Sequence, residues 1–132
     1  MRRTLIILFL SLSAFGGDYT LNGVIDRLEV IESNGNTKAI GDNGRAVGCL
    51  QIWRIMVKEC NRLVKRNEFN DDDRFSRSRS RQMATIFLSH QRTRYFKKFG
   101  KYPSELVLAS SWNTGSIFKQ NTKYKNKYKA VK

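Results

Sequence analysis

The segment IESNGNTKAIGDNGRAVGCLQIW, Ile31 to Trp53, sets one acidic residue, Glu32, at the end of an apolar helical pattern and follows it with turn-forming residues. Apolar side chains recur at helical spacing before it, so the sequence predicts an amphipathic helix from Thr20 to about Ser33. Glu32 lies four residues after Leu28 and therefore falls on the apolar face. Glu29 falls at the rim of that face and is expected to be an ordinary solvated carboxylate.

This position of Glu32 favours a protonated carboxyl group. Removal from water penalises the ionised form, and the negative end of the helix dipole acts in the same direction, so both raise the pKa. A carboxylic acid that keeps its proton near neutral pH is what a glycosidase needs to protonate a leaving oxygen. From the helix alone, a capping glutamate or one paired with Arg45 or a lysine is the alternative.

The rest of the chain is dominated by helical periodicity. The GDNG sequence indicates a short hairpin or a tight irregular loop. Apolar spacing predicts a core helix from Trp53 to Val64, and a third helix from Met83 that lies centrally and ends at Gly100. Residues 67–82 between them are polar and are expected to form a connection.

The C-terminal third predicts two shorter helices. Pro103 suits a first helical position, and Asn113 to Gly115 supply the stop. Tyr124, Tyr128 and Val131 are spaced for a last helical turn or two. At 132 residues, the chain is expected to form one mostly helical domain.

Two ordered motifs carry a family resemblance. The first comprises Glu32-Ser33, Asn36, Ala39, Gly44 to Ala46 and Gly48 to Ile52, and the second runs from Leu108 to Gly115. Together they resemble the soluble lytic transglycosylase family of the lysozyme-like superfamily, over about Leu21 to Tyr128. Cys49 and Leu50 replace a Leu-Met pair of the first motif, and Trp112 and Thr114 replace a tyrosine and an alanine of the second.

The resemblance implies a mainly α, lysozyme-like α+β fold with a small hairpin or turn-rich element beside the cleft. It makes Glu32 the catalytic acid and implies no metal or cofactor. Ser33 would orient Glu32 or touch substrate, with a plain helix-end hydroxyl as the alternative. The expected substrate-binding residues are Ser33, Gly48, Gln51, Ile52, Asn113, Tyr124 and Tyr128.

Residue chemistry agrees with several of these roles. Gly48 lets backbone approach a sugar closely, and Gln51 offers both a donor and an acceptor. Asn113 shares a helical face with apolar residues, so its amide should point into the structure. Structural amides remain the alternative for Gln51 and Asn113. The family's late tyrosine beside the acid is either Tyr124 or Tyr128, and the spacing does not decide between them.

The implied reaction is cleavage of the β-1,4 bond between N-acetylmuramic acid and N-acetylglucosamine in peptidoglycan, with a 1,6-anhydro product. Hydrolysis is the close rival and generally uses a second carboxylate. Asp42 is the candidate, although GDNG also explains it as a turn residue. The run Asp71 to Asp73 is expected to be solvated. With His90 as the only histidine, a packed or partly exposed side chain is expected there rather than a metal ligand.

The chain is strongly basic, with 25 Lys+Arg against 11 Asp+Glu and a formal charge of +14. Such a charge attracts polyanions. The runner-up function is therefore a non-catalytic protein that binds cell-wall polymers or nucleic acid through the RFSRSRSRQ segment and the KYKNKYKAVK tail. A solvated basic loop and tail are the simplest interpretation of both segments.

The first 17 residues have two arginines, an apolar run and small residues near Gly16, which predicts a cleaved signal peptide before a domain of residues 18–132. The apolar run is too short for a membrane span. Export to the periplasm or the exterior weighs against nucleic acid. Peptidoglycan is the expected partner, a secretion or conjugation apparatus is left open, and a monomer is expected. Cys49 and Cys60 are expected to be free thiols, since a single helix would hold them too far apart to bridge.

Overall fold

The computed structural model describes residues 19–131, which form five α-helices and a small antiparallel hairpin. This confirms the predicted mainly helical fold with a hairpin. The elements in chain order are α1 (Leu21–Ser33), β1 (Ile40–Gly41), η1 (Asp42–Gly44), β2 (Ala46–Val47), α2 (Arg54–Val64), η2 (Asp71–Phe75), α3 (Arg77–Phe99), α4 (Glu105–Thr114) and α5 (Thr122–Lys129).

Helix boundaries follow local capping chemistry. The Thr20 hydroxyl accepts a hydrogen bond from the Gly23 amide, 3.0 Å away, and so caps α1. Gly100 and Gly115 end α3 and α4 in the left-handed conformation, as the sequence predicted. The predicted start of α4 was wrong, because Ser104 caps that helix and Pro103 lies before it.

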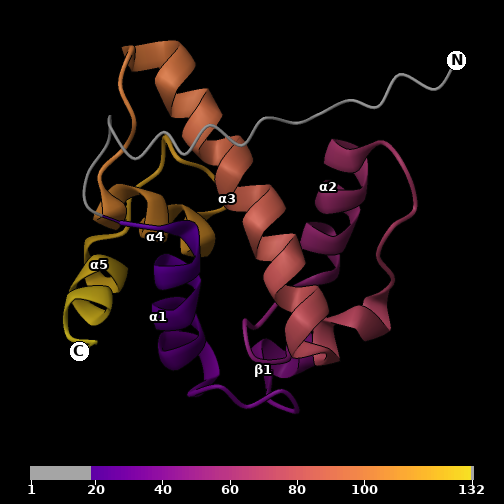
Figure 1. Cartoon of the computed structure of the whole chain (residues 1–132). Helices are drawn as coiled ribbons and strands as arrows, with labels where there is room; N and C mark the ends of the chain where they lie inside the picture. The colour runs from indigo at the N-terminus through magenta and orange to yellow at the C-terminus, as the bar shows by residue number, and fades with distance from the viewer. Residues whose placement is uncertain (1–18, 132) are drawn as a thin grey trace, which may run out of the picture.

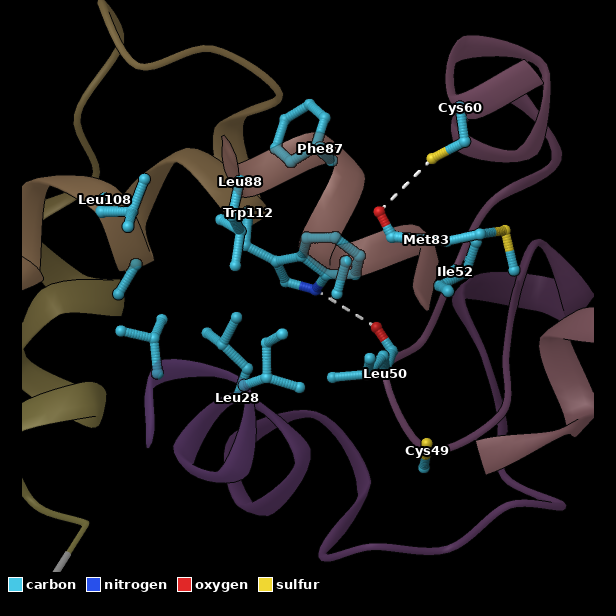
Figure 2. Close-up of a cluster of buried hydrophobic side chains, with 14 of the residues drawn as sticks. Leu28, Cys49, Leu50, Ile52, Cys60, Met83, Phe87, Leu88, Leu108 and Trp112 are labelled. Carbon is cyan, nitrogen blue, oxygen red and sulfur yellow. Dashed lines mark hydrogen bonds between the residues drawn. The ribbon is translucent and has the colours of Figure 1, made fainter. Parts of the chain in front are cut away.

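The long helix α3 is the centre of the fold, as predicted, and packs against α1, α2 and α4. It crosses the molecule diagonally, with α2 on one side and α1 and α4 on the other (Figure 1). Trp112 packs inside this core among leucines, and its indole nitrogen donates a hydrogen bond to the Leu50 carbonyl at 3.2 Å (Figure 2). This bond joins α4 to the segment that follows the hairpin.

The predicted connection at residues 67–82 was wrong in its second half, because α3 begins at Arg77 rather than Met83. The Ser76 hydroxyl caps α3 by accepting a hydrogen bond from the Arg79 amide at 3.2 Å. The first two turns contain arginines and serines and have no apolar stripe. A cap and ion pairs stabilise this part of α3. A prediction based on hydrophobic periodicity cannot detect either of them.

The interpretation of Glu29 as a solvated carboxylate was also wrong, since its side chain is only 3% exposed. Its Oε2 lies 2.7 Å from the Arg77 guanidinium, and its Oε1 lies 3.1 Å from that of Arg81. The early start of α3 brings both arginines to α1. Glu29 is therefore a structural ion-pair partner between the two helices.

Both cysteines are free and buried, as the sequence predicted. The Cys60 thiol donates a hydrogen bond to the Met83 carbonyl at 3.4 Å (Figure 2), and burial raises its pKa to about 12. Within residues 19–131, none of the helices has the length and apolar character needed to cross a membrane. The predicted signal peptide lies outside the described residues.

Candidate active site

A cleft of about 590 Å³ lies between the end of α1, the hairpin, the start of α2 and the end of α4. Glu32 lines it from α1, and Asp42 lines it from η1. The other residues that line the cleft come from all of these elements and from α5. They are Ile31, Gly41, Gln51, Ile52, Trp53, Ile55, Met56, Trp112, Asn113, Thr114, Gly115 and Lys127.

The Glu32 carboxyl is half-buried and accepts a hydrogen bond from the Tyr124 hydroxyl, with 2.7 Å between the two oxygens. Burial raises the pKa of Glu32 above its ordinary value, and the Asp42 charge raises it further. The Tyr124 hydrogen bond and the Lys127 charge act in the opposite direction without reversing the shift. The side chain is thus an acid with a raised pKa in an open cleft.

Tyr124 and Tyr128 have different partners. Tyr124 is buried on α5, and burial beside Glu32 holds its pKa far above the ordinary range, so it is a neutral donor. The Tyr128 hydroxyl instead donates to Glu105 of α4 at 2.6 Å, and Glu105 also pairs with Arg27 of α1. Of the two tyrosines that the spacing left open, the structure brings only Tyr124 to Glu32.

Gln51 and Ile52 both line the cleft. The Gln51 side-chain nitrogen donates to the carbonyls of Gly48, at 3.0 Å, and Ala39, at 3.3 Å. These two bonds tie the hairpin together and leave only the amide oxygen of Gln51 without a described bond. That oxygen lies against Gly41, where a Cβ atom would be 2.4 Å away. The Gln51 side chain therefore has a structural role in the cleft wall, as the structural alternative predicted.

Gly48 does not line the cleft, contrary to the role expected for it. It is buried with φ +83°, and a Cβ atom there would lie 1.8 Å from the Arg74 carbonyl oxygen. The glycine is required by packing against η2 rather than by a sugar. Ser33 is also structural, because its hydroxyl donates to the Cys49 carbonyl at 2.7 Å and accepts from the Asn36 amide.

Asn113 lines the cleft, but its amide does not point into the structure as expected. The residue is exposed, and its Oδ1 accepts a hydrogen bond from the Asn121 side chain at 2.8 Å. Asn113 sits at the last turn of α4, where the helix has already emerged from the core.

Sequence reasoning missed Arg74, which supports the cleft from behind and is only 6% exposed. Its guanidinium donates to the carbonyls of Ile52 at 3.1 Å, Arg45 at 3.3 Å and Asp71 at 2.9 Å. Arg74 therefore fixes the segment that carries Gln51 and Ile52. No sequence pattern distinguishes it from the arginines that follow.

The other arginines of RFSRSRSRQ are also engaged within the protein. Arg79 pairs with Glu68 and Asp73, at 3.4 and 3.6 Å, and Arg81 pairs with Asp26 at 2.8 Å as well as with Glu29. The expectation that this segment is a solvated basic loop was therefore wrong, and the alternative of a polyanion contact loses the free arginines on which it depended. Its charges hold η2, α1 and α3 together.

No group of three or more potential metal-ligating side chains occurs in residues 19–131. His90 is partly exposed, and burial together with the nearby arginine charges lowers its pKa. The chemistry available in the cleft is that of a carboxylic acid, a tyrosine hydroxyl, a second carboxylate and amides.

A glutamic acid whose pKa is raised by burial, in a cleft between a helical core and a small hairpin, is an arrangement that suits a glycan-cleaving enzyme of the lysozyme-like type. The chain belongs to the transglycosylase SLT domain family, whose model matches residues 21–132. Comparisons with curated proteins and with solved structures gave no match. Family membership makes peptidoglycan the substrate and lytic transglycosylase the activity.

Proposed function

We propose that this protein cleaves the β-1,4 bond between N-acetylmuramic acid and N-acetylglucosamine, with Glu32 as the general acid and base and a 1,6-anhydro sugar as product. The observation that carries the proposal is the 2.7 Å pairing of Glu32, which lines the cleft, with the neutral hydroxyl of Tyr124, which is buried behind it. A neutral partner orients the carboxyl group and leaves its proton free for transfer.

In the first step the Glu32 proton passes to the glycosidic oxygen as the bond to the anomeric carbon breaks. The 6-hydroxyl oxygen of the same muramic acid then attacks that carbon, and its proton returns to Glu32. Glu32 ends the cycle as it began. Since no water is added, the reaction does not require a second carboxylate to activate one.

Hydrolysis is a second candidate, because Asp42 lines the same cleft and its charge acts on the pKa of Glu32. A second carboxylate is what a hydrolytic glycosidase uses to activate water or to stabilise the cationic sugar. The two reactions give products that differ by one water per cleaved bond.

The test is digestion of purified peptidoglycan, followed by mass spectrometry of the soluble fragments. Wild type, Glu32→Gln and Asp42→Asn are compared, with Asp72→Asn as a matched control because Asp72 is an exposed carboxylate away from the cleft. We expect anhydro ends from wild type, Asp42→Asn and Asp72→Asn, and no fragments from Glu32→Gln. Water-added reducing ends that disappear in Asp42→Asn would establish hydrolysis instead.

We further propose that the protein is exported and acts where peptidoglycan lies. The arginines and apolar run of residues 1–17 support this. Fractionation of bacterial cells that express the full chain, with N-terminal sequencing of the product, tests it. A mature N-terminus near residue 17 is expected, and a cytoplasmic protein that keeps its first residues would contradict export.

A non-catalytic basic protein is less well supported, since the arginines of the RFSRSRSRQ segment are engaged within the fold. A salt-sensitive complex with DNA in Glu32→Gln, together with wild type that releases no glycan fragment, would favour it.

A further inference from the structure

Exposed aromatic side chains gather at the C-terminal end of α3 and on the adjoining loop of residues 116–120. Phe96, Phe99 and Phe118 are 42%, 50% and 40% exposed. Phe99 and Phe118 meet edge to face with ring centroids 6.4 Å apart, although they are 19 positions apart in sequence. We call residues 94–102 and 116–120 the phenylalanine surface.

The phenylalanine surface is a fixed part of the fold. Beside Phe118, Ile117 is only 2% exposed, and its amide donates to the buried Gln91 side chain at 2.9 Å. Phe118 therefore projects from an anchored loop. Phe96 packs on Tyr102 with centroids 4.8 Å apart, which holds that ring at the end of α3. Three phenylalanine rings are thus held in solvent, where their exposed apolar surface is unfavourable unless a partner covers it.

Cations surround these rings. The Lys98 ammonium lies 4.6 Å from the Phe118 ring centroid, and the Arg94 guanidinium lies 4.8 Å from it. The phenylalanine surface contains no acidic residue, and the sequence has none between Asp73 and Glu105. Its five cationic residues are Arg94, Lys97, Lys98, Lys101 and Lys119.

We propose that the phenylalanine surface docks the protein on an anionic phospholipid bilayer. Phenylalanine has no polar group, so it gains from an acyl-chain boundary but makes no hydrogen bond to the hydroxyls of a hydrated glycan or wall polymer. Lysines and arginines beside it match anionic headgroups, a combination typical of proteins that lie on a membrane. Apolar rings alone would fit any hydrophobic partner, and cations alone any polyanion; the two together select the lipid surface.

The surface is separate from the proposed acid. In Figure 1 the end of α3 projects at the top of the view, whereas β1 and the end of α1, which bear the cleft, lie at the bottom. The loop of residues 116–120 follows the cleft-lining Thr114 and is bonded to it, but no residue of α1 or of the hairpin belongs to the phenylalanine surface. Docking is therefore independent of the proposed reaction, and Glu32→Gln should bind vesicles as wild type does.

The first test is cosedimentation of the full chain with vesicles of phosphatidylglycerol and phosphatidylcholine, with pure phosphatidylcholine for comparison. The variant Lys97→Glu/Lys98→Glu is matched by Lys123→Glu/Lys129→Glu, which changes net charge equally on the exposed face of α5. We expect the first pair to weaken binding to anionic vesicles at least about tenfold, and the second pair to weaken it much less. Equal losses in both pairs would mean generic attraction of a polycation and would overturn the proposal.

The second test reads the apolar contact at one position. In Phe118→Trp the new indole reports the environment of the loop, and wild type, which has only Trp53 and Trp112, is the control. With brominated phosphatidylglycerol we expect quenching beyond that of wild type. This readout stays local even if another segment of the chain also binds vesicles. Cosedimentation without added quenching at position 118, or no cosedimentation at low salt, would overturn the proposal.

The apolar variant Phe99→Ser/Phe118→Ser is compared with Val30→Ser/Ile40→Ser, which removes two exposed apolar side chains elsewhere. Thermal unfolding is measured on each protein first. A folded Phe99→Ser/Phe118→Ser protein should lose vesicle binding several-fold while the Val30→Ser/Ile40→Ser control keeps it. Unchanged binding of the folded phenylalanine variant would contradict insertion of the rings.

Discussion

Glu29 and Glu32 lie one turn apart on α1, and the contrast between them shows how a fold gives two neighbouring carboxyl groups different surroundings, one structural and one suited to the proposed catalysis. Glu29 is nearly inaccessible and is held by Arg77 at 2.7 Å and Arg81 at 3.1 Å. Glu32 faces the cleft and is held by the neutral Tyr124 hydroxyl. Among residues 19–131, no arginine or lysine nitrogen lies within 4.0 Å of the Glu32 carboxyl.

Burial alone therefore does not distinguish the proposed catalytic acid, Glu32, from Glu29. Two guanidinium groups pair with Glu29, so its carboxylate is part of the packing between α1 and α3. At Glu32 burial is opposed only by one hydroxyl and one more distant lysine, and the pKa rises. We propose that the neutral partner and the access to the cleft, more than the depth of burial, suit Glu32 for proton exchange with a substrate.

The largest effect we predict is that of Glu32→Gln, which should lower the rate of peptidoglycan cleavage about 10³-fold, the range of a lost general acid. The change preserves size and can still accept the Tyr124 hydrogen bond. Release of soluble fragments measures the rate. A variant that keeps more than a tenth of wild-type activity would mean that Glu32 is not the catalytic acid. The proposed functional difference between Glu29 and Glu32 would then be wrong.

The same variant should be slightly more stable than wild type at neutral pH. Because burial raises the pKa of Glu32 in the folded protein above its ordinary value of 4.5, the folded state holds this proton more tightly than the unfolded chain. Wild type consequently loses stability as pH rises from about 4.5 through the raised pKa, and Gln does not. Thermal unfolding from pH 4 to 8 should show the two proteins diverge in that window.

Next in size is Glu29→Gln, which should lower the free energy of unfolding by about 3 kcal/mol, as expected when one partner of a buried ion pair is removed. Its proton-transfer chemistry should be unaffected, so the folded fraction should keep wild-type activity. Urea unfolding measures the free energy of unfolding, and release of soluble peptidoglycan fragments measures the activity. A stable Glu29→Gln with impaired cleavage would reverse the roles assigned to the two carboxylates.

Arg77→Gln is the control for that experiment. It removes the more exposed of the two guanidinium groups and leaves Arg81 in place, so the loss of stability should be smaller than for Glu29→Gln. An equal or larger loss would mean that Arg77 matters for a reason other than its pair with Glu29.

Tyr124→Phe should reduce cleavage about tenfold, as expected for one lost hydrogen bond that orients a catalytic group. It should also change the pH profile. The Tyr124 bond lowers the pKa of Glu32, so its removal raises that pKa, and the alkaline limb of the profile moves to higher pH. Tyr128→Phe, which loses a bond to Glu105 instead, should leave the limb in place. A shift in both variants would contradict the assignment of Tyr124.

Much of the fold could be predicted from the sequence, because most of its helices bury a stripe of apolar residues. The stripe around Ile25 and Leu28 and the one around Val57 and Cys60 are both buried as expected. The start of α3 could not be found in this way. Its first turns are stabilised by Arg77 and its neighbours through ion pairs with distant acidic residues, and such pairings leave no periodic pattern.

The candidate site divides in the same manner. Glu32 could be located in the cleft from local helix geometry and motif spacing, whereas Asn113 could be located there only from the family motif, because helix geometry predicted that its amide points into the structure. The functions of Gly48 and Arg74 depend on a contact between segments 26 residues apart, in which the glycine makes room for the arginine carbonyl. The roles of Tyr124 and Tyr128 depended on which carboxyl group each hydroxyl meets, Glu32 for Tyr124 and Glu105 for Tyr128. Contacts of this kind follow only from the assembled fold.

The smallest effect we predict is that of Asp42→Asn. The Asp42 charge raises the pKa of Glu32, so its removal should lower that pKa and move the alkaline limb of the activity profile to lower pH. Asp42 has a left-handed φ of 47°, a conformation that asparagine also tolerates, and the turn should survive. The rate at the optimum should change less than about threefold, since exposed charges interact weakly across solvent.

The shift in Asp42→Asn is opposite in sign to that of Tyr124→Phe, so the double variant should return the limb toward its wild-type position. This cancellation follows if both residues act on the proton of Glu32, one by charge and the other by hydrogen bonding. Rates across pH 4 to 9 for the four proteins complete the cycle. A hundredfold loss of activity in Asp42→Asn, with the alkaline limb unmoved, would instead mean that Asp42 takes part in the reaction, as hydrolysis requires. The comparison that explains the reaction would then be the one between Glu32 and Asp42, the two carboxyl groups of the cleft.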